Sequence, residues 1–155
     1  MSAFYDEVQE LKARYPHWRS ATLPALRLAQ EKYGYLSTEA LRDCAEALGT
    51  TPAFCEAVAS FYDMLHLAPV GRHMVEVCTN VSCALVGARQ VLERFEQELG
   101  LHAGETSEDG SVTLRPVECL GGCGWATIVS VDHGYRRFVT PDDVPAIVQE
   151  LRDGE

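Results

Sequence analysis

The sequence predicts an α+β protein in which an N-terminal four-helix bundle precedes a small α/β domain. Two observations carry this prediction. The first 66 residues hold only helical patterns of apolar residues, and turn residues separate these patterns. After Pro69 and Gly71, extended apolar runs alternate with helical patterns, which is typical of a layered α/β domain. We therefore expect two domains, residues 1–68 and residues 69–155.

Four helices are expected in the first domain. Pro16, Gly34 and Gly49 end the first three apolar patterns, since proline and glycine both interrupt a helix. The pair Thr51–Pro52 is a typical opening for the fourth, with threonine as the N-cap and proline at the first helical position. The expected ranges are 4–15, 23–33, 38–48 and 52–65.

The second domain is expected to begin with a strand over residues 73–78, followed by a helix over 82–99. A turn and a strand then lead to Cys119, and residues 126–139 form a hairpin that turns at 132–134. Thr140 caps a final helix that has Pro141 at its first position. The order strand, helix, strands, helix predicts a small α/β layer of thioredoxin type.

Charge and hydropathy exclude several classes of function. The chain has 155 residues and a formal net charge of −10, from 13 Lys and Arg against 23 Asp and Glu. No stretch collects the basic residues that nucleic acid or an anionic membrane surface would require. Neither a secretory signal nor an apolar run of membrane-spanning length is present, so we expect a cytoplasmic protein without direct membrane insertion. Thiols stay reduced in that compartment, and the six cysteines therefore indicate metal binding or redox chemistry.

The cysteines divide into two groups. Cys44 and Cys55 lie within expected helices, where they are interpreted as small buried apolar residues. The other four form a C-x4-C pair and a C-x3-C pair at the expected carboxyl ends of strands: Cys78 with Cys83, and Cys119 with Cys123. Because such ends meet at one edge of a sheet, we expect the two pairs to lie close together.

Four thiolates would suit zinc or an iron–sulfur cluster, since both prefer soft sulfur ligands. Structural zinc sites most often use C-x2-C pairs, and neither pair here has that spacing. Wider pairs favour a [2Fe-2S] cluster, in which each pair can hold its own iron. A zinc-stabilised interaction module stays open as the alternative. Thiol–disulfide exchange is the weakest possibility, because no C-x-x-C motif occurs in the chain.

Three glycines surround the second pair, in the stretch VECLGGCG. Gly121, Gly122 and Gly124 allow the main chain to pass close to sulfur and to present backbone N–H groups there. Such donors stabilise an anionic cluster. No G-x-G-x-x-G loop occurs, so the chain itself is not expected to bind NADH.

Several stretches in sequence order resemble a known family: VASFYDML, CTNVSC, GETSEDGSVTL, VECLGGCG and VTPDDV. The chain is similar to the small [2Fe-2S] subunit of the NADH dehydrogenase module of bacterial respiratory complex I, over about residues 15–151. This resemblance implies a helical bundle joined to a thioredoxin-like ferredoxin domain, with the four paired cysteines as cluster ligands. One position departs from the family, where proline usually follows the alanine after the last ligand and this chain has Thr127.

The resemblance also implies an electron-transfer role. The expected partners are the flavoprotein subunit, which binds FMN and NADH, and other subunits of the peripheral arm on the cytoplasmic side of the inner membrane. The cluster would exchange single electrons with the FMN, so the chain would be an oxidoreductase subunit with no active site of its own. An equivalent subunit of an NAD-coupled hydrogenase or an NAD-dependent formate dehydrogenase is the alternative within this class.

Overall fold

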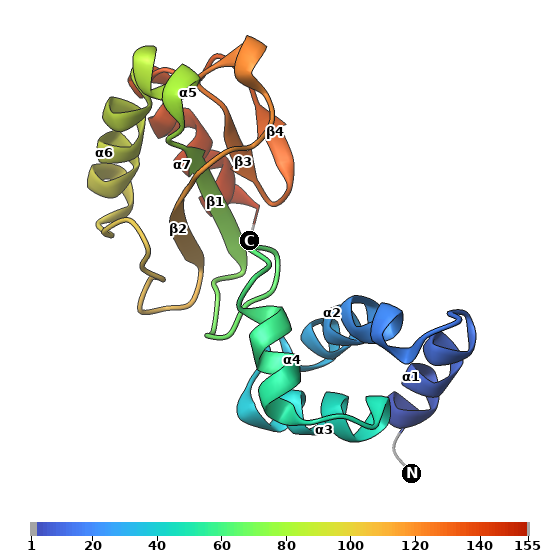
Figure 1. Ribbon diagram of the computed structural model, residues 1–155. Helices are drawn as coiled ribbons and strands as arrows, with labels where there is room; N and C mark the ends of the chain where they lie inside the picture. Colours follow the sequence, from blue (N-terminus) through green and yellow to red (C-terminus); the bar gives the residue numbers. More distant parts are fainter. Residues whose placement is uncertain (1–2, 155) are drawn as a thin grey trace. The chain divides into compact units, whose positions relative to one another are not determined.

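The structure, a computed structural model, describes residues 3–154 (Figure 1). The chain divides into two compact units between Pro69 and Val70. We call residues 3–69 the N-terminal unit and residues 70–154 the C-terminal unit, and describe each by itself. Across residues 3–154, no helix combines the length and the apolar character that crossing a membrane requires.

The N-terminal unit is helical. Its elements are α1 (Ala3–Ala13), a 3-10 turn (Trp18–Ala21), α2 (Thr22–Tyr33), α3 (Thr38–Leu48) and α4 (Pro52–Ala59). Thr51 is the N-cap of α4, as predicted, since its Oγ1 accepts the N–H of Phe54 at 3.3 Å; Ser37 caps α3, with Oγ accepting the N–H of Ala40 at 3.1 Å. All four α-helices contribute to a single apolar core.

Two helix ends differ from the prediction. α1 ends at Ala13 rather than Tyr15, and α4 ends at Ala59 rather than Leu65. The side chain of Gln30 makes two hydrogen bonds to the segment after α4. Gln30 donates to the Met64 carbonyl at 2.9 Å and accepts the N–H of His66 at 2.6 Å. Tertiary hydrogen bonds therefore replace the last helical turns that the apolar pattern predicts.

The C-terminal unit contains one sheet in the order β2-β1-β3-β4. Its strands are β1 (His73–Cys78), β2 (Val112–Val117), β3 (Val129–Val131) and β4 (Gly134–Arg136). β1 and β2 are parallel, whereas β3 is antiparallel to both β1 and β4. Val75 and Val77 share a core with residues of α6 (Ala88–Leu99) and α7 (Val144–Asp153), so both helices pack against the same sheet.

The predicted helix over 82–99 is wrong as a single element. The structure has a short α5 (Val81–Leu85) followed by α6, and the break falls at Gly87, whose φ is +102°. A backbone with this φ cannot continue a right-handed helix, and glycine adopts it without strain. α5 is therefore separate from α6, and it carries Cys83.

The final helix also begins differently from the prediction. Pro141–Asp143 forms a 3-10 turn before α7 starts at Val144. Thr140 does mark the beginning, since its N–H and its hydroxyl donate to the Asp143 carboxylate at 2.8 and 2.7 Å.

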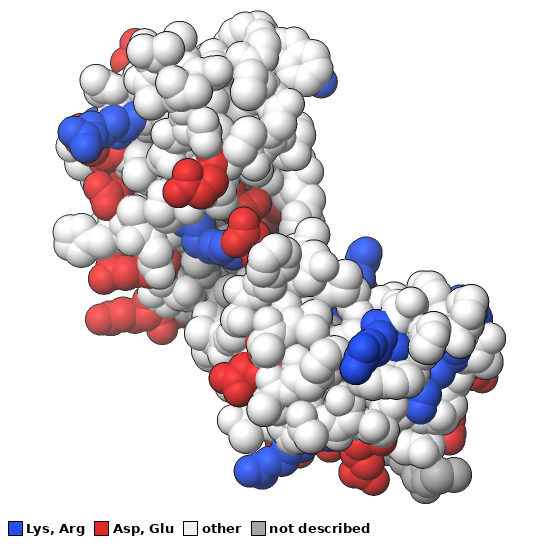
Figure 2. Space-filling model, in the orientation of Figure 1, with Lys and Arg blue, Asp and Glu red and all other residues white. Residues whose placement is uncertain are grey.

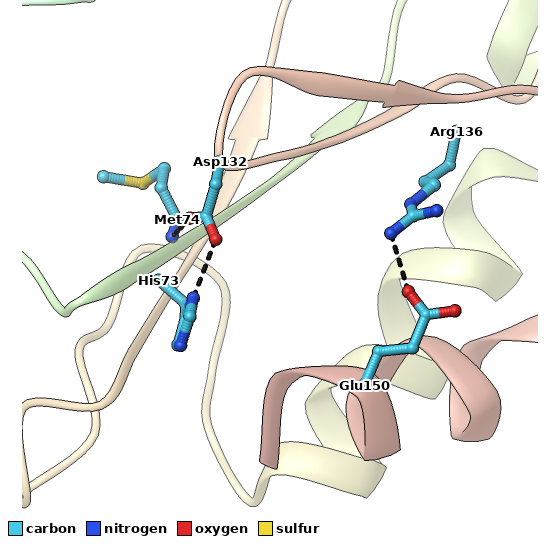
Figure 3. A network of polar contacts seen from close by, with 5 residues as sticks. All are labelled: His73, Met74, Asp132, Arg136 and Glu150. Carbon is cyan, nitrogen blue, oxygen red and sulfur yellow. Dashed lines mark hydrogen bonds and ion pairs between the residues drawn. The ribbon is translucent and has the colours of Figure 1, made fainter. Parts of the chain in front are cut away.

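The β3–β4 hairpin turns at Asp132 and His133, as predicted, and both residues have positive φ. Figure 3 shows how the hairpin is held: the Asp132 carboxylate accepts the N–H of Met74 at 2.8 Å and lies 2.7 Å from Nδ1 of His73. Arg136 pairs with Glu150 of α7 at 2.6 Å. The Asp132 contacts fix the hairpin turn against the start of β1, whereas the Arg136–Glu150 pair joins β4 to α7. β3 follows directly after the loop that carries the second cysteine pair.

Candidate metal centre

Both cysteine loops leave the same edge of the sheet. β1 and β2 run parallel, and Cys78 lies opposite Val117, so the two strands end together. Thr79 holds the first loop on the end of β2, because its N–H and its hydroxyl both donate to the Val117 carbonyl, at 2.9 and 3.2 Å. The predicted strand end at Cys119 is wrong by two residues, since β2 ends at Val117 and Cys119 lies in the loop beyond it.

The first pair is buried. Cys78 and Cys83 expose 4% and 2% of their surface, in a small apolar cluster with Ala88 and Ile128. Burial raises the pKa of the Cys83 thiol, and the neighbouring Cys78 thiol adds to this effect. A hydrogen bond from the backbone of Ile128 acts in the opposite direction. The two thiols are close enough to interact and are largely shielded from water.

The second pair is exposed. Cys119 lies in the loop after β2, and Cys123 opens a short 3-10 turn, Cys123–Trp125. One hydrogen bond links this loop to the first pair: Sγ of Cys78 lies 3.8 Å from the Glu118 carbonyl oxygen. The nearby Cys123 thiol also contributes to the raised pKa of Cys83. Within residues 3–154, no three Cys, His, Asp or Glu side chains gather as they would around a single metal ion.

The three loop glycines differ in what the structure requires of them. Gly121 has a φ of +73°, and its N–H donates to Sγ of Cys119 at 3.3 Å. A Cβ on Gly122 would lie 2.7 Å from Cγ1 of Ile128, so the packing leaves no room for a side chain. Gly124 has open space around it and no positive φ, and the structure gives no conformational reason for glycine there.

The donor set matches a [2Fe-2S] cluster. Four thiols stand in two separate pairs at one sheet edge, and backbone N–H groups lie beside sulfur in each pair. Soft sulfur ligands together with nearby N–H donors are what an anionic iron–sulfur cluster needs.

Ile128 is a residue of this site that the sequence did not reveal. Its carbonyl accepts the N–H of Cys78 at 3.1 Å, its backbone bonds the sulfur of Cys83, and its side chain fills the space beside Gly122. Nothing in the chemistry of isoleucine marks such a role. Only the antiparallel pairing of β3 with β1 brings this residue to the cysteines.

The remaining two cysteines lie in the other unit. Cys44 on α3 and Cys55 on α4 are fully buried, in agreement with the prediction. A hydrogen bond between the two thiols, together with their burial, raises the pKa of Cys44. This pair belongs to the core of the helical unit, with the apolar residues around it.

Exposed apolar side chains accompany the candidate ligands. α5, which carries Cys83, exposes Val81 and Leu85, Val86 follows it, and Trp125 comes two residues after Cys123. Phe138 is exposed next to Trp125, since its N–H donates to the Trp125 carbonyl at 3.0 Å. The guanidinium of Arg137 stacks on the Trp125 ring at 4.1 Å. We call the five apolar residues the apolar rim: Val81, Leu85, Val86, Trp125 and Phe138.

Comparisons with known proteins identify the family of the chain. The family model of the thioredoxin-like [2Fe-2S] ferredoxins matches residues 8–152. A subunit of the NADH-quinone oxidoreductase of Rhizobium meliloti is 37% identical over 150 residues, which cover 97% of this chain and 89% of that protein. A subunit of the NADH-quinone oxidoreductase of Thermus thermophilus is 35% identical over 153 residues, covering 97% and 84%.

A third relative and a solved structure extend the comparison. A subunit of the NADH-quinone oxidoreductase of Mycobacterium bovis is 41% identical over 146 residues, covering 94% of this chain but 58% of that longer protein. A crystal structure of NAD+-reducing [NiFe]-hydrogenase in the air-oxidized state matches 83% of this chain and 23% of its own, with a TM-score of 0.73 and 16% identity. That likeness concerns the fold alone.

Proposed function

The chain belongs to the thioredoxin-like [2Fe-2S] ferredoxin family, and from that premise we propose that it is the electron-transfer subunit of an NADH:quinone oxidoreductase, the respiratory complex I. Relatives named as subunits of NADH-quinone oxidoreductase align with nearly the whole chain. The observation that carries the proposal is the placement of two cysteine pairs in loops that leave the ends of the parallel strands β1 and β2, joined by the hydrogen bond from Cys78 to the Glu118 carbonyl.

Cys78, Cys83, Cys119 and Cys123 are the proposed ligands, one pair for each iron. When bound, the [2Fe-2S] cluster supplies a site that takes up and releases one electron. The chain contributes shielding on one side, where Cys78 and Cys83 are buried, and access on the other, where Cys119 and Cys123 are exposed. Gly121 and Ile128 supply backbone N–H donors, which stabilise the negative charge on the cysteine sulfurs.

The proposed partner is the flavoprotein subunit that binds FMN and NADH, within a peripheral arm on the cytoplasmic side of the membrane. The apolar rim supports docking beside the cluster, because its exposed side chains lie on or next to the elements that carry Cys83 and Cys123. A partner there would also cover the exposed second pair and bring its flavin near. On the face that Figure 2 shows, basic and acidic side chains are interspersed, without the broad basic patch that nucleic acid would need.

We also propose that the two units are independent domains, with a boundary at residues 68–69, and that the four N-terminal helices form a bundle. Each unit has an apolar core of its own, which supports the boundary. The single core shared by α1 to α4 supports the bundle.

The alternatives make different demands. An equivalent subunit of an NAD-coupled hydrogenase or formate dehydrogenase would use the same ligands, and the fold shared with an NAD+-reducing hydrogenase is compatible with it. The names of the relatives favour complex I. A zinc-stabilised interaction module would need the same cysteines but no electron transfer.

Reduction by NADH tests the proposed role. We expect NADH to leave the cluster oxidised in the isolated chain, because the chain has no NADH-binding motif, and to reduce it once the flavoprotein subunit is added. Dithionite, which needs no flavin, serves as the control and should reduce the isolated chain. A cluster that dithionite reduces, but that NADH never reduces in the complex, would contradict the proposal.

A further inference from the structure

Thr127 carries a buried hydroxyl without a partner. Only 1% of the residue is exposed, and Oγ1 has no hydrogen-bond partner within the described part of the chain. The main chain is fixed at this point, because the Thr127 carbonyl accepts the N–H of Val139 at 2.9 Å. An unpaired buried hydroxyl costs free energy, and buried polar groups are therefore nearly always paired. Among the described residues, the Thr127 hydroxyl therefore has a proton to donate and no acceptor for it.

The neighbours of Thr127 lie against the first cysteine pair. Ala126 packs on the small apolar cluster that contains Cys78 and Cys83, and Ile128 is part of that cluster. The backbone of Ile128 bonds the N–H of Cys78 on one side and the sulfur of Cys83 on the other. Thr127 therefore lies in the chain between two residues that pack beside this pair.

We propose that the Thr127 hydroxyl donates a hydrogen bond to a sulfur of the bound [2Fe-2S] cluster and so raises its reduction potential. The inference rests on the proposed function, because the acceptor is the cluster itself. A cluster held by four thiolates is anionic and gains one further negative charge on reduction. A donor at sulfur stabilises the reduced form more than the oxidised form, which makes the potential less negative.

Two substitutions and a matched control test the assignment. Thr127→Val removes the hydroxyl and keeps the shape, whereas Thr127→Ser keeps the hydroxyl. Thr22→Val is the control, since Thr22 is the other buried hydroxyl without a partner that the structure identifies among residues 3–154, and it lies in the N-terminal unit. The readout is the midpoint potential of the cluster, titrated by electron paramagnetic resonance.

We expect Thr127→Val to move the potential to a more negative value, Thr127→Ser to stay near the parent, and Thr22→Val to leave the potential unchanged. If Thr127→Val keeps the cluster signal and the parent potential, the hydrogen bond from Thr127 to the cluster is overturned, while the proposed function stands. Absence of any iron–sulfur signal in the unsubstituted chain overturns the proposed function, and the assignment with it.

Denaturant unfolding provides a second readout and distinguishes the cluster from a buried water as the acceptor. In the apoprotein the hydroxyl has no cluster to bind, so Thr127→Val should be at least as stable as the parent, while the loaded protein should retain its cluster less well. An equal loss of stability in both forms assigns the hydroxyl to a water and overturns the inference. The apoprotein comparison applies even if Thr127→Val does not retain the cluster.

Discussion

The two units contain the same residue type in two opposite settings. In the N-terminal unit, Cys44 and Cys55 are fully buried between helices and bond each other. In the C-terminal unit, four cysteines lie at or after the ends of strands, and one of the two pairs is exposed. In the first setting the thiols bond each other within a core, and in the second they are available to bind a cofactor. Placement at strand ends, rather than cysteine content, therefore distinguishes candidate ligands from packing residues.

The largest expected difference between the two settings is in cluster binding. Cys119→Ser should lose or strongly alter the cluster, because a hydroxyl is a poor replacement for thiolate at iron. Cys44→Ser is the matched variant in the other unit, and its absorption spectrum and iron content should equal those of the parent. Equal spectral damage from both variants would contradict the division of the cysteines.

A smaller effect should separate two glycines of the same loop. In Gly122→Ala the new Cβ would meet Ile128 at 2.7 Å, and the resulting shift should cost about 1–3 kcal/mol, as overpacking does. Gly124→Ala meets no atom within 4 Å and should change little. Denaturant unfolding of both variants, with their iron content, measures the difference. If Gly124→Ala were the more damaging of the two, the described loop packing would be wrong.

In the helical unit, Cys44→Ala should reduce stability without reaching the cluster. The substitution leaves Cys55 without its partner and a small cavity in the core, at a cost of about 1 kcal/mol. Urea unfolding followed by far-ultraviolet circular dichroism measures the loss, and the cluster spectrum of the folded protein should stay unchanged. If Cys44→Ala lost the cluster while its helices stayed folded, cluster binding would depend on the helical core, which contradicts the separation of the two cysteine settings.

The smallest expected effect concerns two arginines, each of which stacks on a tryptophan ring in its own unit. Arg137→Gln removes a guanidinium that lies 4.1 Å from the centre of the Trp125 ring, and should cost about 0.5–1 kcal/mol at this exposed position. Arg19→Gln removes a looser contact, 5.6 Å from Trp18 in the N-terminal unit, and should cost less. Thermal unfolding of the two variants compares their losses of stability. A larger loss in Arg19→Gln than in Arg137→Gln would argue against a specific Arg137–Trp125 contact.

Much of the fold could be predicted from local signals. Ser37 and Thr51 mark helix starts, and the turn at Asp132 and His133 marks the hairpin, because caps and turns depend on residues close in sequence. The errors have tertiary causes or arise where one pattern covers two elements. Gln30, distant in sequence, bonds the backbone of Met64 and His66 where the apolar pattern predicts the end of the fourth helix, and the apolar periodicity continues across the break at Gly87.

The candidate site was also predictable only where it depends on residues close in sequence. The spacing of the cysteines and the glycines beside them indicates a cluster loop, and the positive φ of Gly121 fits the backbone freedom expected of those glycines. The roles of Ile128 and Thr127 depend on the pairing of β3 and on an unpaired hydroxyl, and neither leaves a mark in the sequence. Exposure of the second pair likewise follows from the three-dimensional course of the loop.

The central claim is that the four paired cysteines hold a [2Fe-2S] cluster. The most direct test is to measure iron, acid-labile sulfide and zinc in the purified chain, together with its paramagnetic resonance spectrum after dithionite reduction. The account predicts a red-brown protein with two irons and two sulfides per chain and a rhombic signal on reduction. A colourless protein with one zinc, no iron and no signal would contradict it and would favour the zinc-stabilised module.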